Sequence, residues 1–425
     1  MRTCAQMPYH AGIVLRLYPS REQRRIIAVN DGCRRAVYNC LVAMNNERYL
    51  LSKTAHLVPA YRDRLCFLDS ILNNKAVPLP RAMKNRMPFL YGQDIDSLTV
   101  DNAIKNYRAA WNKFREDPRA GIPTFHRKGY KQSYQTNAHY HKDAEGINDG
   151  NVRFLNTNHI TLPILGTVRI RGSRKRLLAI MNRKDTRIGT ITIRKDAVGR
   201  YFVSLQLASE YPFADTLPHS GAVVGIDLNI DNFLWDSNNK VVNNPKFRRN
   251  EQQNIARLQR AMCRKKEQAK KDGRPLSSCK NYQKDRIALA RLHSRIAGRA
   301  NDFRHVIAKE YVENQDCIFA EDLKVRNLLK NHKLALAISE CGWSDFLKKL
   351  KVKSSLYGRT FILVPPHHTT QTCSSCGHVL TDVDRLTLGD REWVCPECGA
   401  YHVRDYNAAK NVLARGVATL GLTPV

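Results

Sequence analysis

Two pairs of cysteines near the C-terminal end of the chain have the spacing of a metal site. Eighteen residues separate the pairs, and Gly377 and Gly399 follow them directly, where such turns often need a positive φ. Two thiolates on each of two tight turns can close a tetrahedron around Zn²⁺. Four protein ligands leave no position for water, so we expect a structural zinc ion. The four residues are Cys373, Cys376, Cys395 and Cys398.

Three carboxylates stand where apolar runs end or a helix begins. Asp227 ends the run 223–227, Glu321 follows the run 317–320, and Asp405 lies seven residues after the last cysteine, where a helix should start. Nucleases of the RNase H type use this order of strand Asp, strand Glu and helix Asp. Clustered carboxylates can hold two Mg²⁺ ions roughly 4 Å apart, which activate water and stabilise the leaving oxygen in phosphodiester cleavage.

Each of these carboxylates also has a purely structural interpretation. An aspartate at a strand end is commonly a turn former or a helix cap, and a carboxylate in the first turn of a helix, such as Asp405, is stabilised by the helix dipole. Asp231, Asp236 and Asp322 lie close by in the sequence and are alternative ligands. Spacing alone therefore leaves the three-carboxylate site as one of several interpretations.

The charge of the chain indicates a polyanionic partner. Of 425 residues, 70 are Lys or Arg and 38 are Asp or Glu, a formal net charge of +32. Nucleic acid is the expected partner for such an excess, and a merely solvated basic surface is the alternative. The segment 246–299 concentrates this charge, with 17 basic and four acidic residues. Such density favours a surface that tracks phosphates over an ordinary solvated helix face.

The apolar runs and the cysteines indicate the cellular compartment of the protein. We find no run of 18 apolar residues and no apolar signal-peptide core, so we expect neither a membrane span nor secretion. The other eight cysteines are scattered singly, as is typical of reduced thiols in a cytosol. We therefore expect a cytoplasmic protein, and the sequence implies no protein oligomer.

The segments that must position these residues differ in their predicted secondary structure along the chain. A strand at 12–18 ends at a break, and Ser20 with Gln23 forms a capping box for a helix. The region to about residue 115 is mostly helical. The aromatic residues of its last helix either pack in a core or stack on bases. Short β-type runs follow at 152–154, 160–162, 167–171, 187–194 and 201–207, and we expect the first strand to pair with them.

From residue 221 the pattern becomes α/β. Strands are expected at 223–227, 232–235, 317–320 and 359–364, with two helices divided at 273–275 and a last helix starting near 404. The expected fold is therefore α/β and α+β multidomain. An antiparallel β region comes first, and an α/β region follows, with the cysteines between its last strand and its last helix.

Seven short motifs give the chain a family resemblance. In order and together with the four cysteines, they resemble the TnpB proteins of bacterial and archaeal insertion sequences. These are RNA-guided DNA nucleases related to compact type V CRISPR effectors and to eukaryotic Fanzor proteins. The motifs are Leu15–Pro19, Gly121–Pro123, Gly225–Asp227, Ala320–Val325, Gly342–Trp343, Thr372–Gly377 and Arg404–Ala409.

The resemblance implies a division of the chain into domains. Residues 1–19 and 120–215 would form a β-rich wedge domain, and 20–119 a helical recognition domain inserted in it. Residues 221–366 and 400–425 would form an RNase H-like (RuvC) nuclease domain. Residues 367–399 would form an inserted zinc-binding knuckle that handles target nucleic acid. Base pairing with a guide RNA would then supply sequence specificity.

The same resemblance implies the function and its residues. The chain would be an RNA-guided DNA endonuclease encoded by a transposable element, with guide RNA and target double-stranded DNA as partners. Asp227, Glu321 and Asp405 would be the catalytic Mg²⁺ ligands, and the four cysteines would hold structural Zn²⁺. The protein would associate with the nucleoid when it is bound to its target.

Two positions depart from the family pattern. Asn229 stands where the family usually has Gly, and Val403 where it often has Asp. Asparagine tolerates left-handed backbone better than other non-glycine residues, so we expect the turn to form. The alternatives are a nuclease-inactive RNA-guided DNA-binding repressor and a compact type V CRISPR effector. The older label of transposase would require a strand-joining activity for which the sequence offers no nucleophile.

Overall fold

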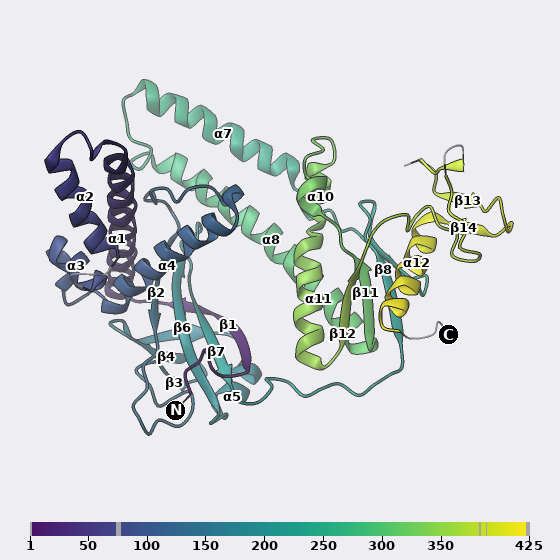
Figure 1. Ribbon diagram of the computed structural model, residues 1–425, viewed down its shortest axis with the longest axis horizontal. Coiled ribbons are helices and arrows are strands. Elements are labelled where there is room, and N and C mark those ends of the chain that lie inside the picture. The colour runs from purple at the N-terminus through teal and green to yellow at the C-terminus, as the bar shows by residue number, and fades with distance from the viewer. Residues whose placement is uncertain (1, 74–77, 382–383, 388, 422–425) are drawn as a thin grey trace. The chain divides into compact units, whose positions relative to one another are not determined.

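The computed structural model describes residues 2–73, 78–381, 384–387 and 389–421, which form two compact units, Met1–Phe213 and Ala214–Val425. Each unit is built around its own sheet (Figure 1).

The first unit contains a seven-stranded antiparallel sheet. Its strand order is β2-β6-β7-β1-β5-β4-β3, so the first strand of the chain pairs with β7 on one side and β5 on the other. This pairing confirms the expectation that the helical region is inserted between strands of one sheet. The strands are β1 (Tyr9–Tyr18), β2 (Gln132–Asn137), β3 (Arg153–Asn156), β4 (His159–Leu162), β5 (Gly166–Arg171), β6 (Thr186–Lys195) and β7 (Tyr201–Ser209).

Alternating side chains give this sheet one buried and one exposed face. Ile13, Leu15 and Leu17 of β1 are buried in the core beneath the sheet, as the period of two requires. The helix α5 (Arg174–Met181) packs Leu177 and Ile180 into the same core. The sequence patterns predicted neither α5 nor β2, since both are short and β2 is almost entirely polar.

The helices of the first unit pack on one another through a separate core. Ser20 caps α1, and its capping box with Gln23 is formed as predicted. Tyr107 is buried and Trp111 packs against the core, which confirms the core interpretation for these two aromatics. The helices are α1 (Arg21–Thr54), α2 (Pro59–Leu72), α3 (Leu79–Arg86) and α4 (Ser97–Glu116), with 3₁₀ turns η1 (Pro88–Tyr91) and η2 (Pro118–Ala120).

The second unit is built on a five-stranded mixed sheet. Its order is β10-β9-β8-β11-β12, and β8, β11 and β12 are parallel while β9 and β10 are antiparallel to their neighbours. In order of sequence the strands are therefore arranged 3-2-1-4-5. They are β8 (Val223–Asp227), β9 (Asn232–Asp236), β10 (Val241–Asn243), β11 (Cys317–Glu321) and β12 (Thr360–Val364).

Helices cover both faces of this sheet (Figure 1). Ile226 and Ile318 face the helices α8 (Lys280–Asn314) and α11 (Trp343–Tyr357) in the larger core. Phe319, on the opposite face, packs against α12 (Arg404–Thr419). Strands buried on both faces explain the continuous apolar runs in the sequence.

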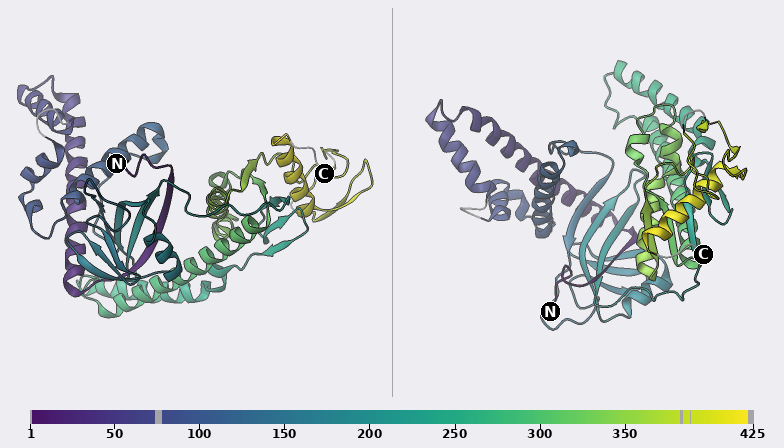
Figure 2. Two further views of the ribbon diagram at one scale, coloured as in Figure 1. Left: turned by 90° about the horizontal axis from the view of Figure 1, so that it is seen from below. Right: turned by 45° about the vertical axis from the view of Figure 1, so that its right-hand side comes forward.

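Long basic helices and a small hairpin complete the unit. The predicted pair of helices is present as α7 (Gln252–Lys271) and α8, which lie side by side (Figure 2). The two strands of the hairpin flank the second cysteine pair, one before Cys395 and one after Cys398. The remaining elements are α6 (Phe247–Asn250), α9 (Val325–Leu328), α10 (Ala335–Cys341), β13 (Glu392–Val394) and β14 (Tyr401–Val403). Within the described part of the chain, none of the helices has the length and apolar character needed to cross a bilayer.

Candidate active site

Three predicted carboxylates converge at one end of the second sheet. Ala320 of β11 is paired in parallel register with Ile226 of β8, so the next residues, Glu321 and Asp227, end neighbouring strands. Asp405 lies in the first turn of α12, which packs directly on β8. The three side chains are almost fully buried, with exposed fractions of 5% for Asp227, 5% for Glu321 and 8% for Asp405.

The pKa values of two of these carboxylates are shifted by burial and by charged neighbours. Burial raises the pKa of Asp227 well above its ordinary value, and the charges of Glu321 and Asp405 raise it further, while Arg404 opposes the shift. Burial also raises the pKa of Glu321, against a hydrogen bond from Thr369 and the charge of Arg415. Buried carboxylates whose pKa values are raised by burial and by charged neighbours, as these two are, occur often at functional sites.

Neutral and cationic groups hold two of these carboxylates in place. The Thr369 hydroxyl donates to Glu321 Oε1 at 2.6 Å. Asn229 Nδ2 donates to Asp405 Oδ2 at 3.0 Å, and Arg391 Nη1 lies 3.7 Å from the same oxygen. The motif comparison had not identified Thr369 or Arg391, because each lies far in sequence from the carboxylate that it contacts.

Asn229 has a different role from the one expected. The turn expected at Asn229 forms between the antiparallel strands β8 and β9, but Asn229 is not among the described non-glycine residues with positive φ, so its backbone is not left-handed. Its side chain instead accepts a hydrogen bond from the Asn232 backbone at 2.8 Å while it donates to Asp405. The amide thus connects the turn between β8 and β9 to α12.

The structure distinguishes the three clustered carboxylates from the three alternative ligands nearby in the sequence. Asp236 is buried, but it accepts a 2.8 Å hydrogen bond from the Tyr311 hydroxyl and two more from the backbone of its own turn. Asp231 and Asp322 are exposed and pair with Arg391 and Lys324, respectively. Asp236 is therefore a turn former, and the other two acids lie outside the buried cluster.

The four cysteines form a compact cluster, as the spacing predicts. Their sulfur atoms lie within 4.8 Å of one another, and Cys373 and Cys395 are buried while the other two are exposed. Gly377 and Gly399 have φ values of 80° and 71°, which confirms the expected left-handed turns. Four thiols at tetrahedral spacing on two such turns are a donor set that fits a single soft metal ion.

A histidine that the spacing rule did not include supports this cluster. His402 Nε2 lies 3.0 Å from Cys373 Sγ, and its ring packs on Trp393 with the centroids 4.7 Å apart. Both residues belong to the hairpin β13–β14, which reaches Val403. The expected boundary of the knuckle at residue 399 therefore falls inside one hairpin, because the strand after the last cysteine pairs with the strand before it.

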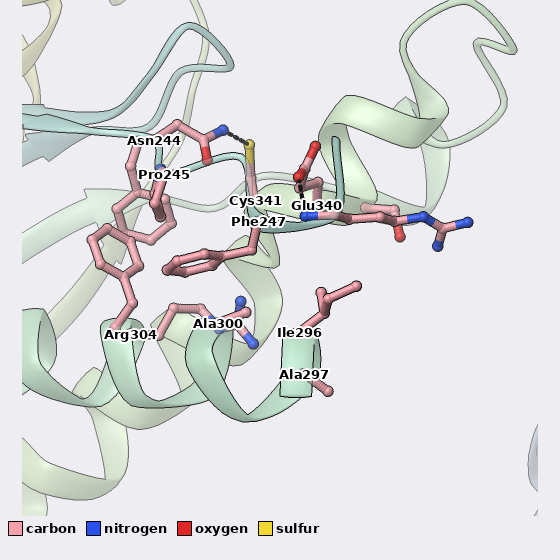
Figure 3. A pocket seen from close by; sticks show the side chains of 13 residues that line it. Asn244, Pro245, Phe247, Ile296, Ala297, Ala300, Arg304, Glu340 and Cys341 are labelled. Carbon is pink, nitrogen blue, oxygen red and sulfur yellow. Dashed lines mark hydrogen bonds between the residues drawn. The ribbon is translucent and has the colours of Figure 1, made fainter. Parts of the chain in front are cut away.

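A cavity of about 200 Å³ in the same unit contains none of these carboxylates (Figure 3). Phe247 and Arg304 lie on two of its walls, and Asn244 Nδ2 donates to Cys341 Sγ at 3.3 Å beside it. Its lining is largely apolar, and the backbone N–H of Arg248 donates to Glu340. Glu340 also accepts from the Arg249 backbone, and Asn244 holds the Cys341 thiol, so we take the buried carboxylate cluster as the candidate active site.

Comparison with known proteins assigns the chain to a protein family. Models described as "Cas12f1-like, TNB domain", "Probable transposase" and "Helix-turn-helix domain" match residues 343–412, 205–332 and 7–53. The chain is 31% identical to a protein of Streptomyces pristinaespiralis named as a candidate RNA-guided DNA endonuclease, over 95% of this chain and 88% of the relative. It is 20% identical to a TnpB-like protein of Acanthamoeba polyphaga mimivirus, over 95% and 72%. The chain belongs to the TnpB family.

Two further comparisons give a second similar sequence and a similar fold. InsQ of Escherichia coli, also named as a candidate RNA-guided DNA endonuclease, is 27% identical over 79% of each chain. The fold resembles that of Cas12f1 in a complex with sgRNA and target DNA, with a TM-score of 0.53, 15% identity and coverage of 95% and 98%. Residues 7–53 form one strand and one long helix here, so the segment matched by the helix-turn-helix model has no such motif.

Proposed function

We propose that this chain is an RNA-guided DNA endonuclease of a transposable element, and that it cleaves guide-matched DNA at Asp227, Glu321 and Asp405. The observation that carries the proposal is the burial of these three carboxylates together at one end of a 3-2-1-4-5 sheet. Relatives over most of the chain are named for the same activity.

Magnesium is the cation that suits the carboxylate cluster. Its donors are hard oxygens, and a divalent charge would offset the repulsion and burial that raise the pKa of Asp227. Bound Mg²⁺ would supply a nucleophile and charge stabilisation for phosphodiester hydrolysis.

Residues of this chain would prepare the site for the substrate. Thr369 and Asn229 each donate to one oxygen of a carboxylate and so orient its remaining lone pairs. Burial of the cluster excludes bulk water and strengthens its interactions with a bound phosphate. Arg391, which is half exposed beside Asp405, supplies positive charge at the edge of the site.

The domain assignment follows from the same proposal. Residues 221–366 and 400–425 would be the RuvC-like nuclease domain, and its strand order supports this assignment. Residues 1–19 and 120–215 would be the wedge domain, with 20–119 as the recognition domain. The cysteine cluster would hold zinc and keep the insertion 367–399, with the rest of its hairpin, folded for contact with target DNA.

The exposed face of the first sheet supports a role in holding RNA. Phe202 of β7 is paired with Arg16 of β1 and with Arg194 of β6, and both guanidinium groups lie over its ring, at 5.0 and 4.7 Å from the centroid. Arg16 is in turn paired with Arg171 of β5. Such a row of arginine and aromatic side chains suits phosphates and stacked bases.

The test begins with the RNA that copurifies with the protein. Sequencing that RNA supplies the guide, and a plasmid that carries the matching target is then incubated with the complex and Mg²⁺. Cleavage of the matched plasmid, and not of a scrambled one, supports the proposal. Target binding without cleavage would instead identify a nuclease-inactive binder, and joined transposon ends would identify a transposase.

A further inference from the structure

One face of α12 holds the segment 365–374, which connects β12 to the first cysteine pair. Asn411 Nδ2 donates to the backbone carbonyls of Thr369 at 2.8 Å and Thr372 at 2.7 Å. Asn407 Nδ2 donates to the same Thr372 carbonyl at 2.7 Å, and its Oδ1 accepts from the Ser374 backbone at 2.9 Å. Both amides are buried, with exposed fractions of 1% for Asn407 and 7% for Asn411, so these bonds are shielded from competing water.

A third residue on α12 extends this row. Arg415 follows Asn407 and Asn411 at the same spacing of four residues, which places the three on one side of the helix. Its Nη1 donates to the Pro365 carbonyl at 3.0 Å and to the carbonyl of His367. The helix that carries Asp405 thus fixes the backbone of the segment at both ends.

Thr369, in the middle of this segment, contacts Glu321, a second carboxylate of the cluster. Thr369 is 3% exposed, and its hydroxyl donates to Glu321 Oε1 at 2.6 Å, the short distance typical of a bond to a carboxylate. Its backbone carbonyl is one that Asn411 holds. A continuous row of contacts therefore runs from α12 through Thr369 to the end of β11.

We propose that Thr369 is a positioning residue for Glu321 and that Asn411 acts on Glu321 through Thr369. This inference rests on the proposed role of Glu321 as a metal ligand. A threonine χ1 angle is restricted, so fixing its backbone fixes the direction of its hydroxyl. The hydroxyl occupies one oxygen of Glu321 and holds the carboxylate in a single orientation toward the cation.

The first experiment compares Thr369→Val with Thr369→Ser in the full-length chain freed of RNA. Manganese is the probe, and its binding is followed by electron paramagnetic resonance, counting only the ions that Glu321→Gln removes. Valine keeps the shape and loses the donor, so we expect the Mn²⁺ affinity to fall about 10- to 100-fold. Serine keeps the donor and should restore most of the affinity.

Thr419→Val is the matched control, since its hydroxyl donates to the Arg415 carbonyl at 2.8 Å and lies away from the carboxylates. This variant should bind Mn²⁺ as the wild type does. Equal binding by Thr369→Val and the wild type would overturn the inference. A wild type that binds no such Mn²⁺ would contradict the proposed metal site itself, a different failure.

A double-mutant cycle tests the route through Thr369. Asn411→Ala should weaken Mn²⁺ binding, and the double variant with Thr369→Val should be little worse than Thr369→Val alone, because both changes act on one contact. Additive losses would show that Asn411 does not act through Thr369. Thermal unfolding of each variant shows whether a loss of Mn²⁺ binding comes from loss of the fold. If Asn411→Ala does not fold, the comparison of Thr369→Val with Thr369→Ser still tests the role of Thr369.

Discussion

At the scale of single residues, the carboxylate cluster is held in a state that is unfavourable without a cation. Asp227 sits between Glu321 and Asp405 at the end of a buried strand, and both neighbours raise its pKa after burial itself. The folding energy of the surrounding sheet and helices must offset this repulsion. We therefore expect a divalent ion to stabilise the folded chain if it binds at this site.

The first prediction concerns stability and pH. The raised pKa values of Asp227 and Glu321 mean that the folded chain binds more protons than the unfolded chain above the ordinary carboxyl range. Stability without magnesium should therefore fall as pH rises through that window, up to the raised pKa values. Asp227→Asn should be more stable than the wild type at about pH 8, by roughly 0.5–2 kcal/mol.

Thermal unfolding in magnesium-free buffer measures this difference. The gap between Asp227→Asn and the wild type should shrink as the pH is lowered toward the ordinary carboxyl range, because the raised pKa of Asp227 makes the folded aspartate increasingly neutral. Added Mg²⁺ should raise the melting temperature of the wild type more than that of the variant. A gap that is independent of pH would contradict this account of the cluster.

The second prediction concerns Asn229, which contacts Asp405. Asn229→Ala removes the 3.0 Å hydrogen bond to Asp405 and the 2.8 Å bond from Asn232. The Mg²⁺ concentration needed for half-maximal cleavage should rise about tenfold, because the carboxylate loses its fixed orientation. The rate at saturating Mg²⁺ should change much less. An unchanged magnesium requirement would show that the contact does not orient Asp405.

The sequence could single out three candidate carboxylates but not what holds them. The apolar patterns placed Asp227, Glu321 and Asp405 at the ends of elements, and only the family resemblance favoured grouping them into one candidate site. Thr369 and Asn229 could not, because their partners lie 48 and 176 residues away and hydrogen bonds of this range leave no local pattern. The turn expected at Asn229 forms without a left-handed residue there, and the sequence did not show that the Asn229 side chain would reach Asp405.

At the scale of elements, the approach of α12 to the sheet decides where Asp405 lies. A Cβ added at Gly225 would be 2.3 Å from the Ala409 carbonyl oxygen, and one added at Gly416 would be 2.1 Å from the Phe319 ring. Both distances are shorter than any real Cβ contact, so the helix and the strands meet only because glycine stands at these two positions. Asp405 is brought to Asp227 by this close packing.

The third prediction tests that packing. Gly225→Ala should push α12 from β8 and destabilise the second unit by about 1–3 kcal/mol, with a loss of cleavage. Gly298→Ala is the matched control, because Gly298 lies within α8 with no atom near its Cβ position. That change should stabilise the helix by about 0.5–1 kcal/mol. Thermal unfolding compares the two, and equal effects would contradict the close-packing account.

Elements with strong periodicity were predictable, and short polar ones were not. The capping box at Ser20, the strands that end at Asp227 and Glu321, and the break between α7 and α8 were all visible in local patterns. The strand β2 was missed because it is short and almost entirely polar, and the helix α5 because its eight residues are too few to show a helical period. The hairpin β13–β14 was missed because each of its strands has three residues and is held mainly by the cysteine cluster.

At the scale of the whole molecule, charge governs how the chain meets its partners. A formal net charge of +32 on 425 residues requires a polyanion for compensation. Much of it lies on α7 and α8, and the arginine row of the first sheet adds more. Contacts of this kind position a nucleic acid by its backbone and leave sequence reading to base pairing.

The fourth prediction follows from this charge. Binding of the copurified RNA should weaken steeply with salt, by about 10³-fold or more between roughly 50 and 200 mM, if it neutralises six or more phosphates. Arg16→Ala on the first sheet should lower both the affinity and the salt slope. A filter-binding series over this range measures both quantities. Affinity that does not change with salt would contradict the electrostatic account.

The most direct test of the account is the single-turnover rate of guide-matched DNA cleavage in Mg²⁺ by four alanine variants. We expect Asp227→Ala, Glu321→Ala and Asp405→Ala each to lose about 10³-fold or more in rate while they still bind the target. Asp322→Ala, next to Glu321 but exposed and paired with Lys324, should cleave as the wild type does. Near-normal cleavage by any of the first three variants would contradict the claim that these carboxylates form one catalytic site.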